Sequence, residues 1–476
     1  MEKRMDLTKG SIIPTLVKLA LPIMGTSFIQ MAYNMTDMIW IGRVGSSAVA
    51  AVGTAGFFTW LAMAFIMISK IGAEIKVSQT IGAHLYKETK GYVQSALQIN
   101  IVLAIIYMFV LLIFKAPLVG FFNLGDQEII QMSYTYLEVM ALGMIFYFLN
   151  PVFTAIFNGS GDSKTPFIIN TIGLVFNIVF DPLLILGFGP IPALGVLGAA
   201  LATVVAQIVV SLCFIVIMIK SRATYLKVNL FAKPDFKSMK TLCSIGFPGA
   251  LQSGLFTLIS MTLGRLVAAY GPVPIAVQKV GSQIESISWM TAGGFSTALG
   301  AFVGQNYGAK QYERIQKGYQ TTVALAIGLG VFATLLLVFA GKPIFSFFLP
   351  EAEAIEQGEV YLKILGYSQL FMCIEITTQG LFNGLGRTYI PSIVGIVLTG
   401  ARIPLAYLIA QPQFLGIDGV WWAITISSVA KGIVLVGIYL YLKKRNRLYL
   451  HQQETDIQLN EKLDVKAVDL KQEFES

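Results

Sequence analysis

Charged side chains are scarce in this sequence. Only 13% of its 476 residues are Asp, Glu, Lys or Arg, whereas 55% are hydrophobic. Soluble proteins carry about 25% charged residues, because a chain folded in water needs a charged surface. The shortage therefore excludes a protein with a mainly aqueous surface. The mean hydropathy of +0.70 agrees with a chain whose surface faces lipid.

Histidine and cysteine are also rare. His84 and His451 lie in polar segments outside the apolar runs, and Cys213, Cys243 and Cys373 have no metal-binding or redox spacing. Cysteine without such spacing usually packs as a small apolar residue. We therefore expect no zinc site, no cofactor and no histidine-based catalysis. The sequence also shows no nucleophile–base pair, so a membrane-embedded enzyme is disfavoured.

Long apolar runs recur from one end of the chain to the other. Each is about 20 residues or longer, which is enough to cross the hydrocarbon core as a helix. Inside a bilayer every backbone polar group must be bonded within its own segment, so such runs are helices. The sequence therefore predicts an all-α membrane protein with twelve transmembrane helices. The predicted spans are 13–39, 48–69, 92–114, 132–157, 166–188, 195–219, 242–268, 275–303, 319–341, 358–382, 389–411 and 416–442.

The net charge of +8 indicates orientation rather than nucleic-acid binding. With the N-terminus placed in the cytoplasm, the outer loops carry only Arg43, Lys115, Arg265 and Lys342, and the cytoplasmic loops carry several times more basic residues. Multi-pass proteins concentrate Lys and Arg in cytoplasmic loops. We therefore expect a multi-pass protein of the cell (inner) membrane with both termini in the cytoplasm. The first run lacks a small-residue cleavage site, so no cleaved signal is expected.

The chain contains an internal repeat. Three segments of the first half return at nearly one distance along the chain: 21–22 as 247–248, 79–86 as 305–312, and 157–166 as 382–391. Chance recurrence at one spacing is improbable, so the chain is a duplication. Each half has six spans and enters from the same side, as in transporters built from parallel repeats. We predict an N-terminal bundle (1–219), a linker (220–241), a C-terminal bundle (242–447) and a polar cytoplasmic tail (448–476).

Two carboxylates inside predicted spans are the strongest candidates for a site. An ionisable group in a bilayer is costly and marks function by default, although an ion pair joining helices is the structural alternative. Asp37 lies near the outer end of the first span, and Asp181 lies roughly 10 Å from the outer end of the fifth. Thr203 lies at a similar depth in the sixth span, and Asn177 shares a helix face with Asp181. We expect these four side chains to form one site.

The chemistry of this site leaves two ligands open. Carboxylate, amide and hydroxyl oxygens suit a hard cation such as Na⁺. The same carboxylates, desolvated and mutually repelling, would equally favour a bound proton. The coupling ion is therefore expected to be Na⁺ or H⁺.

The first span also carries a polar face. Gln30, Tyr33 and Asp37 follow one another at spacings of three and four residues, and Pro22 precedes them. Such residues share one helix face, so we expect Gln30 and Tyr33 to contact substrate. Proline inside a helix frees a backbone carbonyl and permits bending, so Pro22 is the predicted bending point, with a static kink as the alternative.

The second half differs chemically from the first. The equivalent of Asp181 is Ala406, and this half instead carries Glu285 on the eighth span and Glu375 on the tenth, where Glu375 aligns with Asn150. Cationic substrates are held by anionic and aromatic groups. We therefore predict that Asn150, Glu285 and Glu375 bind substrate between the halves.

These features resemble the multidrug and toxic compound extrusion (MATE) family. The likeness extends over roughly residues 10 to 442 and rests on the order and spacing of four segments: 36–42 after Pro22, 158–162, 177–182 followed by 198–203, and 305–309. The resemblance implies V-shaped pairs of six-helix bundles that exchange Na⁺ or H⁺ for organic cations by alternating access. One prokaryotic branch, of the DNA-damage-inducible type, implies cation ligands at Asp37, Asn177, Asp181 and Thr203. Another uses acidic residues on spans seven and ten, of which only Glu375 is present here.

A lipid-linked precursor flippase of the same superfamily is the main alternative. Its anionic cargo would require a cationic cleft, and Lys279, Arg402 and Lys431 keep that hypothesis open. We expect instead an exporter that binds small-molecule organic cations or drugs, contacts the lipid bilayer, functions as a monomer and has no nucleic-acid partner.

Overall fold

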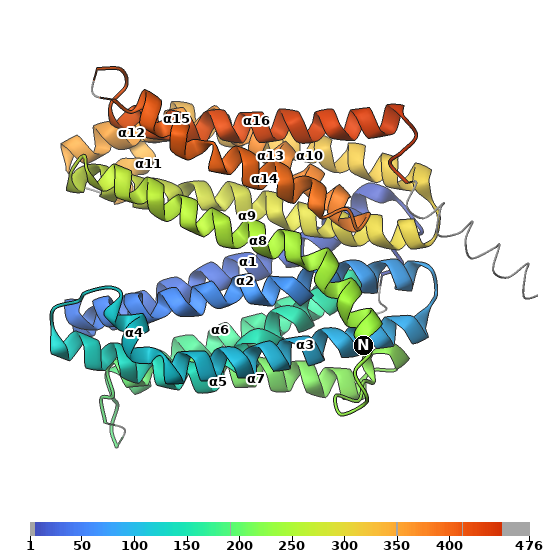
Figure 1. Cartoon of the computed structure of the whole chain (residues 1–476), viewed down its shortest axis with the longest axis horizontal. Helices are drawn as coiled ribbons and strands as arrows, with labels where there is room; N and C mark the ends of the chain where they lie inside the picture. Colours follow the sequence, from blue (N-terminus) through green and yellow to red (C-terminus); the bar gives the residue numbers. More distant parts are fainter. Residues whose placement is uncertain (1–4, 191, 349–350, 412, 450–476) are drawn as a thin grey trace, which may run out of the picture.

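The computed structural model describes residues 5–190, 192–348, 351–411 and 413–449, and its helices form two bundles (Figure 1). Most of the predicted tail lies outside these residues. The first bundle consists of α1 (Ile12–Val44), α2 (Ser46–Gly82), α3 (Tyr86–Ile113), α4 (Lys115–Gly120), α5 (Gln127–Gly159), α6 (Lys164–Ile185) and α7 (Val196–Lys220). A linker with the 3₁₀ turn η1 (Thr224–Leu226) leads to the second bundle.

The second bundle repeats the first. It consists of α8 (Phe236–Ala268), α9 (Pro272–Gly308), α10 (Tyr312–Phe339), α11 (Gly341–Phe348), α12 (Ala352–Gly366), α13 (Gln369–Gly384), α14 (Tyr389–Gly400), α15 (Arg402–Ile409) and α16 (Ile417–Lys444). The backbone repeats as well: His84 and Lys310 both adopt a left-handed conformation, with φ of 60° and 57°, after α2 and α9. Gly161 and Gly386 follow α5 and α13 with φ of 87° and 76°, a region that favours glycine.

Each predicted span corresponds to one helix or to one interrupted helix. Among the described helices, ten are long and apolar enough to cross a membrane when α14 and α15 are counted as one. The remaining two of the twelve predicted spans are α9, which contains Lys279 and Glu285, and the pair α12–α13. The predicted run 358–382 is broken at Tyr367 and Ser368, directly after the weak helix former Gly366. The run 389–411 is divided at Ala401.

The helices α2 and α9 continue well beyond their predicted ends at 69 and 303. Their last turns are polar, which is why hydropathy alone does not include them in a span. These turns are buried: Ser78, Gln79, Gln305 and Asn306 are at most 9% exposed. Protein rather than lipid surrounds them, so a polar helical segment is tolerated there.

The two bundles meet where the last turns of α2 and α9 cross. A Cβ added at Gly82 would overlap the carbonyl oxygen of Gln305, and one added at Gly308 would overlap the carbonyl oxygen of Gln79. Only glycine lets two backbones approach so closely. The side chain of Gln79 donates to the Gly384 carbonyl at 3.0 Å, which adds a hydrogen bond between the bundles. We call this contact the glycine crossing.

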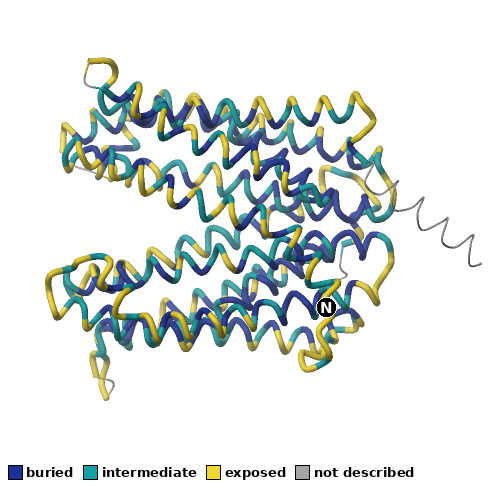
Figure 2. Tube along the Cα trace, in the orientation of Figure 1, coloured by how far each residue is buried: buried dark blue, intermediate teal, exposed yellow. Residues whose placement is uncertain are grey.

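The bundles separate toward the opposite end of the same helices. A Cβ added at Gly53 or Gly56 on α2, or at Gly254 or Gly264 on α8, would have no neighbour within 4 Å. Figure 1 shows the same divergence of the ribbons, and Figure 2 shows buried residues gathered near the crossing. The molecule is therefore a V of two six-helix bundles. Its closed end is the side on which the N-terminal residues and the linker lie, here called the N-terminal side.

Residues 5–10 pack across this closed end. Leu7 is fully buried in the apolar cluster of the second bundle. Its N–H donates to Gln305 Oε1 at 3.3 Å, and its carbonyl accepts from Asn306 Nδ2 at 3.1 Å. Arg314 donates to the carbonyls of Leu7, Lys9 and Gly10. The N-terminal segment thus holds the start of α1 against the second bundle.

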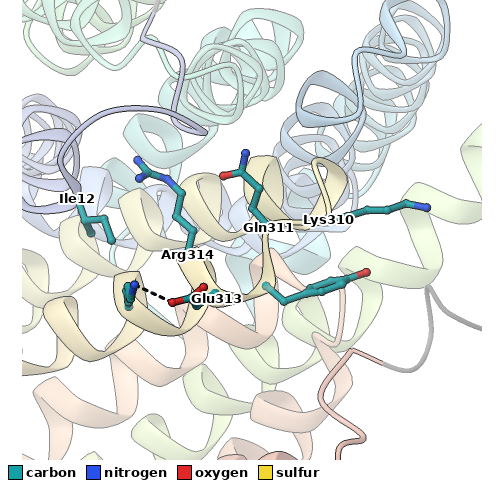
Figure 3. Close-up of a pocket in the computed structure, with 7 residues that line it drawn as sticks. Ile12, Lys310, Gln311, Glu313 and Arg314 are labelled. Carbon is teal, nitrogen blue, oxygen red and sulfur yellow. Dashed lines mark ion pairs between the residues drawn. The ribbon is translucent and has the colours of Figure 1, made fainter.

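A surface pocket of about 480 Å³ adjoins this segment, lined among others by Ile12, Gln311 and Arg314 (Figure 3). Its charges are partnered, since Glu313 and Lys317 form an ion pair at 2.7 Å. Ile12 and Asp37 stand at opposite ends of α1, about 37 Å apart at 1.5 Å per residue. The pocket is therefore remote from the carboxylates singled out in the sequence.

Candidate functional site

Three helices of the first bundle bring the four predicted side chains together. Asp37 comes from α1, Asn177 and Asp181 from one face of α6, and Thr203 from α7. Asn177 and Asp181 are fully buried, and Thr203 is 6% exposed. Asn177 Nδ2 donates to Asp181 Oδ1 at 2.9 Å. The Asp37 carboxylate lies close enough to Asp181, Asn177 and Thr203 to interact with them. The common depth expected from the sequence thus corresponds to a cluster in space.

Four oxygen atoms of this cluster are buried without a hydrogen-bond partner. They are Asp37 Oδ1, Asn177 Oδ1, Asp181 Oδ2 and Thr203 Oγ1. We call these atoms the oxygen cluster. A buried polar atom without a partner costs free energy, more so when it is charged. Two ionised carboxylates that lie close together repel each other and neither can donate a hydrogen bond, so a proton or a cation between them would satisfy both.

The donor set decides which cations fit. All four atoms are oxygens, which hard cations prefer. Within the described parts of the chain, no group of three or more His, Cys, Asp or Glu residues could hold a metal ion. The oxygen cluster therefore fits a monovalent hard cation or a proton rather than a transition metal.

Two tyrosines adjoin the oxygen cluster. Tyr33, on α1, is buried, and its hydroxyl donates to the Thr203 carbonyl at 3.4 Å. Tyr136, on α5, is 6% exposed and close enough to Asp37 and Asp181 to interact with their charges. The sequence led us to expect that Tyr33 contacts substrate. The structure places Tyr33 beside the two carboxylates. Sequence reasoning missed Tyr136, although its recurrence as Tyr361 in the second half is a signal that could have found it.

The other predicted residues of α1 lie apart from the cluster. Gln30 is exposed. Pro22 lies within the continuous helix α1, between Ala20 and Ile23, which are buried against the second bundle. Thr26 Oγ1 donates to the Pro22 carbonyl at 3.0 Å. Pro22 is therefore placed where α1 leaves the second bundle, and its role in bending stays a prediction.

Asn150 does not lie between the bundles. It is 5% exposed inside the first bundle, where its Nδ2 donates to Gln207 Oε1 at 2.6 Å and its Oδ1 accepts from Ser211 at 2.6 Å. These bonds join α5 to α7. Asn150 thus contributes to the contact between these two helices, and its role in substrate binding stays a prediction. The sequence indicated its depth but not the direction of its side chain.

Glu285 and Glu375 do not form an anionic surface either. Glu375 Oε2 pairs with Lys431 Nζ at 3.0 Å, and both side chains are about nine-tenths buried. Glu285 Oε1 accepts from Gln369 Nε2 at 3.0 Å. The cation Arg402 lies close enough to interact with both carboxylates. Basic residues of α15 and α16 therefore lie beside both carboxylates within the second bundle, and substrate binding by Glu285 and Glu375 stays a prediction.

The fold and the oxygen cluster together define a class: a multi-pass membrane protein made of two repeated bundles, one of which holds a cluster of buried oxygens without hydrogen-bond partners. The MatE family model matches residues 22–183 and 248–408, once in each half. The chain belongs to this family.

Curated relatives match almost end to end. A probable multidrug resistance protein NorM of Thermotoga maritima is 27% identical over 447 residues, covering 92% of this chain and 94% of the relative. An FAD transporter of Shewanella oneidensis is 26% identical, with coverages of 91% and 95%. The multidrug export protein MepA of Staphylococcus aureus is 23% identical, with coverages of 92% and 95%.

Solved structures share the fold. A MATE protein in a bent conformation has a TM-score of 0.86 at 22% identity, covering 95% of this chain and 99% of its own. An outward-facing multidrug resistance MATE transporter of the MOP superfamily has a TM-score of 0.83 at 23% identity, covering 94% and 99%. The all-α fold of twelve helices in two bundles agrees with these neighbours.

Proposed function

We propose that this chain is a secondary active multidrug exporter that exchanges Na⁺ or H⁺ for organic cations by alternating access. The observation that carries the proposal is the oxygen cluster, in which the carboxylates of Asp37 and Asp181 lie close together and each keeps one buried oxygen without a hydrogen-bond partner. Cation or proton binding there would remove a large electrostatic cost. Ion binding is thus linked to the packing of α1 against α6 and α7.

Alternating access is supported by the way the bundles meet. Their contact at the glycine crossing is confined to the N-terminal side, and the other ends of α2 and α8 stand free. The excess of basic residues in the loops of the N-terminal side supports a cytoplasmic location for that side. In this orientation the described state opens outward. Ion binding in the first bundle would change its contacts with the second, and rocking about the crossing would reverse the opening.

The substrate class is supported by the relatives, two of which are named for multidrug resistance or export. Two of the three cations that favour the flippase alternative, Arg402 and Lys431, are occupied inside the second bundle rather than offered to an anionic cargo, whereas Lys279 is exposed. An FAD transporter among the relatives shows that related chains also carry an anionic dinucleotide. Organic cations are therefore proposed first, and FAD is the comparison substrate for the test.

The test is transport in proteoliposomes under separately imposed Na⁺ and H⁺ gradients. Wild-type protein should export ethidium under one of the two gradients and should export little FAD. Asp181→Asn should reduce gradient-driven export by at least about tenfold, because one of the paired charges that binds the ion is lost. Glu138→Gln is the matched control, since it neutralises a carboxylate of the same bundle that pairs with Lys115 away from the cluster.

Two results would contradict the proposal. Export by Asp181→Asn at the wild-type rate under both gradients would exclude the oxygen cluster as the coupling site. Gradient-driven transport of FAD without transport of ethidium would contradict organic cations as the substrate class, but it would not contradict the oxygen cluster as the coupling site.

A further inference from the structure

The second bundle contains a counterpart of the oxygen cluster, and the repeat identifies its residues. On the fifth span the spacing that relates Gly161 to Gly386 places Arg402 at the position of Asn177 and Ala406 at that of Asp181. On the fourth span it pairs Tyr136 with Tyr361. These equivalences locate the counterpart next to Tyr361, which is buried and interacts with the charge of Arg402.

A shared backbone contact gives the register of the sixth span. A Cβ added at Gly198 would overlap the carbonyl oxygen of Leu184, and one added at Gly419 would overlap that of Ile409. Leu184 and Ile409 are themselves equivalent in the repeat, so Gly198 corresponds to Gly419. Counting on from these glycines, Ile424 occupies the place of Thr203.

At the positions of Asn177, Asp181 and Thr203 the counterpart has therefore lost the oxygens of the first bundle. An amide has become a guanidinium, a carboxylate has become a methyl group, and a hydroxyl has become an aliphatic chain. None of these replacements can bind a free cation. The one that is charged is itself a cation.

The guanidinium of Arg402 is built into the bundle. The side chain is 7% exposed. Its Nε donates to Ser427 Oγ at 3.0 Å and one terminal nitrogen donates to Ser428 Oγ at 3.0 Å. Ser427 in turn donates to the Leu398 carbonyl at 2.8 Å. No described carboxylate forms an ion pair with Arg402; the charges of Glu375 and Glu285 act on it from further away.

The charge balance differs between the two bundles. In the second bundle the buried acids Glu285 and Glu375 are matched by the buried cations Arg402 and Lys431. In the first bundle no described basic residue forms an ion pair with Asp37 or Asp181. The cations of the second bundle are thus side chains of the protein, whereas the first bundle must bind a cation from solution.

We propose that Arg402 is a tethered cation, which takes the place that an exchangeable ion has in the first bundle and limits ion exchange to the first bundle. This inference rests on the proposed function. It assigns Arg402 a positioning role, since its charge, together with that of Lys431, balances Glu285 and Glu375 without contacting substrate. It also assigns one exchangeable ion site to the transporter.

The first experiment tests the tethered cation by chemical rescue of stability. Thermal unfolding of the purified protein is followed by tryptophan fluorescence for wild type, Arg402→Ala, Arg402→Lys and Arg265→Ala, the last a solvent-exposed arginine as control. Arg402→Ala should unfold about 5–10 °C lower, since Lys431 would then be the one cation among the described residues left to face the charges of both Glu285 and Glu375. Arg402→Lys should recover most of this loss.

Guanidinium ion is the decisive probe. Millimolar guanidinium chloride, compared with choline chloride at equal ionic strength, should raise the unfolding temperature of Arg402→Ala and leave wild type and Arg265→Ala unchanged or slightly lower. If Arg402→Ala does not respond, or unfolds at the wild-type temperature, the position does not require a cation and the proposal is overturned.

The second experiment separates this inference from the proposed function and does not depend on the folding of Arg402→Ala. Ethidium is added to purified protein, and the ion displaced is measured as proton release with an indicator dye or as loss of bound ²²Na⁺. Wild type and Arg402→Lys should give signals of equal size, and Asp181→Asn should give none. A signal remaining in Asp181→Asn would show a second exchangeable ion and overturn the tethered cation. No signal in wild type would instead contradict the proposed function.

Discussion

At the scale of single residues, the candidate site is defined by buried oxygen atoms that lack hydrogen-bond partners. Asp181 and Asn177 bond to each other, yet each retains one oxygen without a partner, and Thr203 contributes another. In a low-dielectric bundle such atoms are costly unless a ligand bonds to them. Any ligand that satisfies all of them must be small and positively charged.

Thr203 allows the contribution of one neutral ligand to be measured. Thr203→Ala removes Oγ1 and should lower the apparent affinity for the coupling ion by about tenfold, which corresponds to the loss of one interaction with a charged group. The maximal export rate should change much less, because both carboxylates remain. The measurement is ethidium export as a function of coupling-ion concentration. Thr203→Ser keeps the hydroxyl and should behave as wild type; an equal loss in Thr203→Ser would indicate packing rather than ligation.

At the scale of helices, buried polar contacts determine how neighbours pack. Asn150, Gln207 and Ser211 join α5 to α7 in the first bundle. The repeat places Glu375 at the position of Asn150, and there it pairs with Lys431 to join α13 to α16. The same helix contact is therefore made by a neutral network in one half and by an ion pair in the other.

The ion pair predicts a non-additive pair of substitutions. Glu375→Gln should destabilise the protein by about 3–5 kcal/mol, because it leaves Lys431 charged and unpaired in a bundle. Glu375→Gln combined with Lys431→Met should recover most of this loss, since replacing both partners is often neutral. Thermal unfolding of the two single variants and the double variant gives the coupling energy. Additive losses would mean that the two charges act independently. Reduced export by Glu375→Gln alone would therefore not by itself indicate substrate binding.

At the scale of the whole molecule, the V is held at one end by backbone contact. Gly82 and Gly308 lie so close to the opposing helix that no side chain fits between them. Few side chains lie in this contact, chiefly Gln79 and Gln305, whose hydrogen bonds to Gly384 and Gly159 would have to break when the closed end opens. The N-terminal segment, held by Gln305 and Arg314, lies over it and would have to move when the closed end opens.

Gly82→Val should shift the molecule away from the described state. Its side chain would overlap the backbone of Gln305, so the closed end would be forced apart. Spin labels on the free ends of α2 and α9 should then report a shorter distance in a larger fraction of molecules. Gly91→Val is the control, because a Cβ at Gly91 meets nothing within 4 Å. Identical distance distributions for Gly82→Val and wild type would show that the crossing does not govern the equilibrium.

The sequence by itself determined the number of spans, the duplication and the depth of the polar residues, because lipid imposes helices of one length and repeated segments preserve their spacing. Depth was sufficient to group Asp37, Asn177, Asp181 and Thr203, which share a level on adjacent helices. Only the tertiary structure decided which way each side chain points. In the structure Asn150 bonds to Gln207 inside the first bundle, and Lys431, from a span far along the chain, pairs with Glu375. Arg402, which aligns with Asn177 in the repeat, bonds to Ser427 and Ser428. Hydropathy averages over all faces of a helix, so the pairing of charges across a bundle is decided by helix rotation and packing, which a single sequence does not specify.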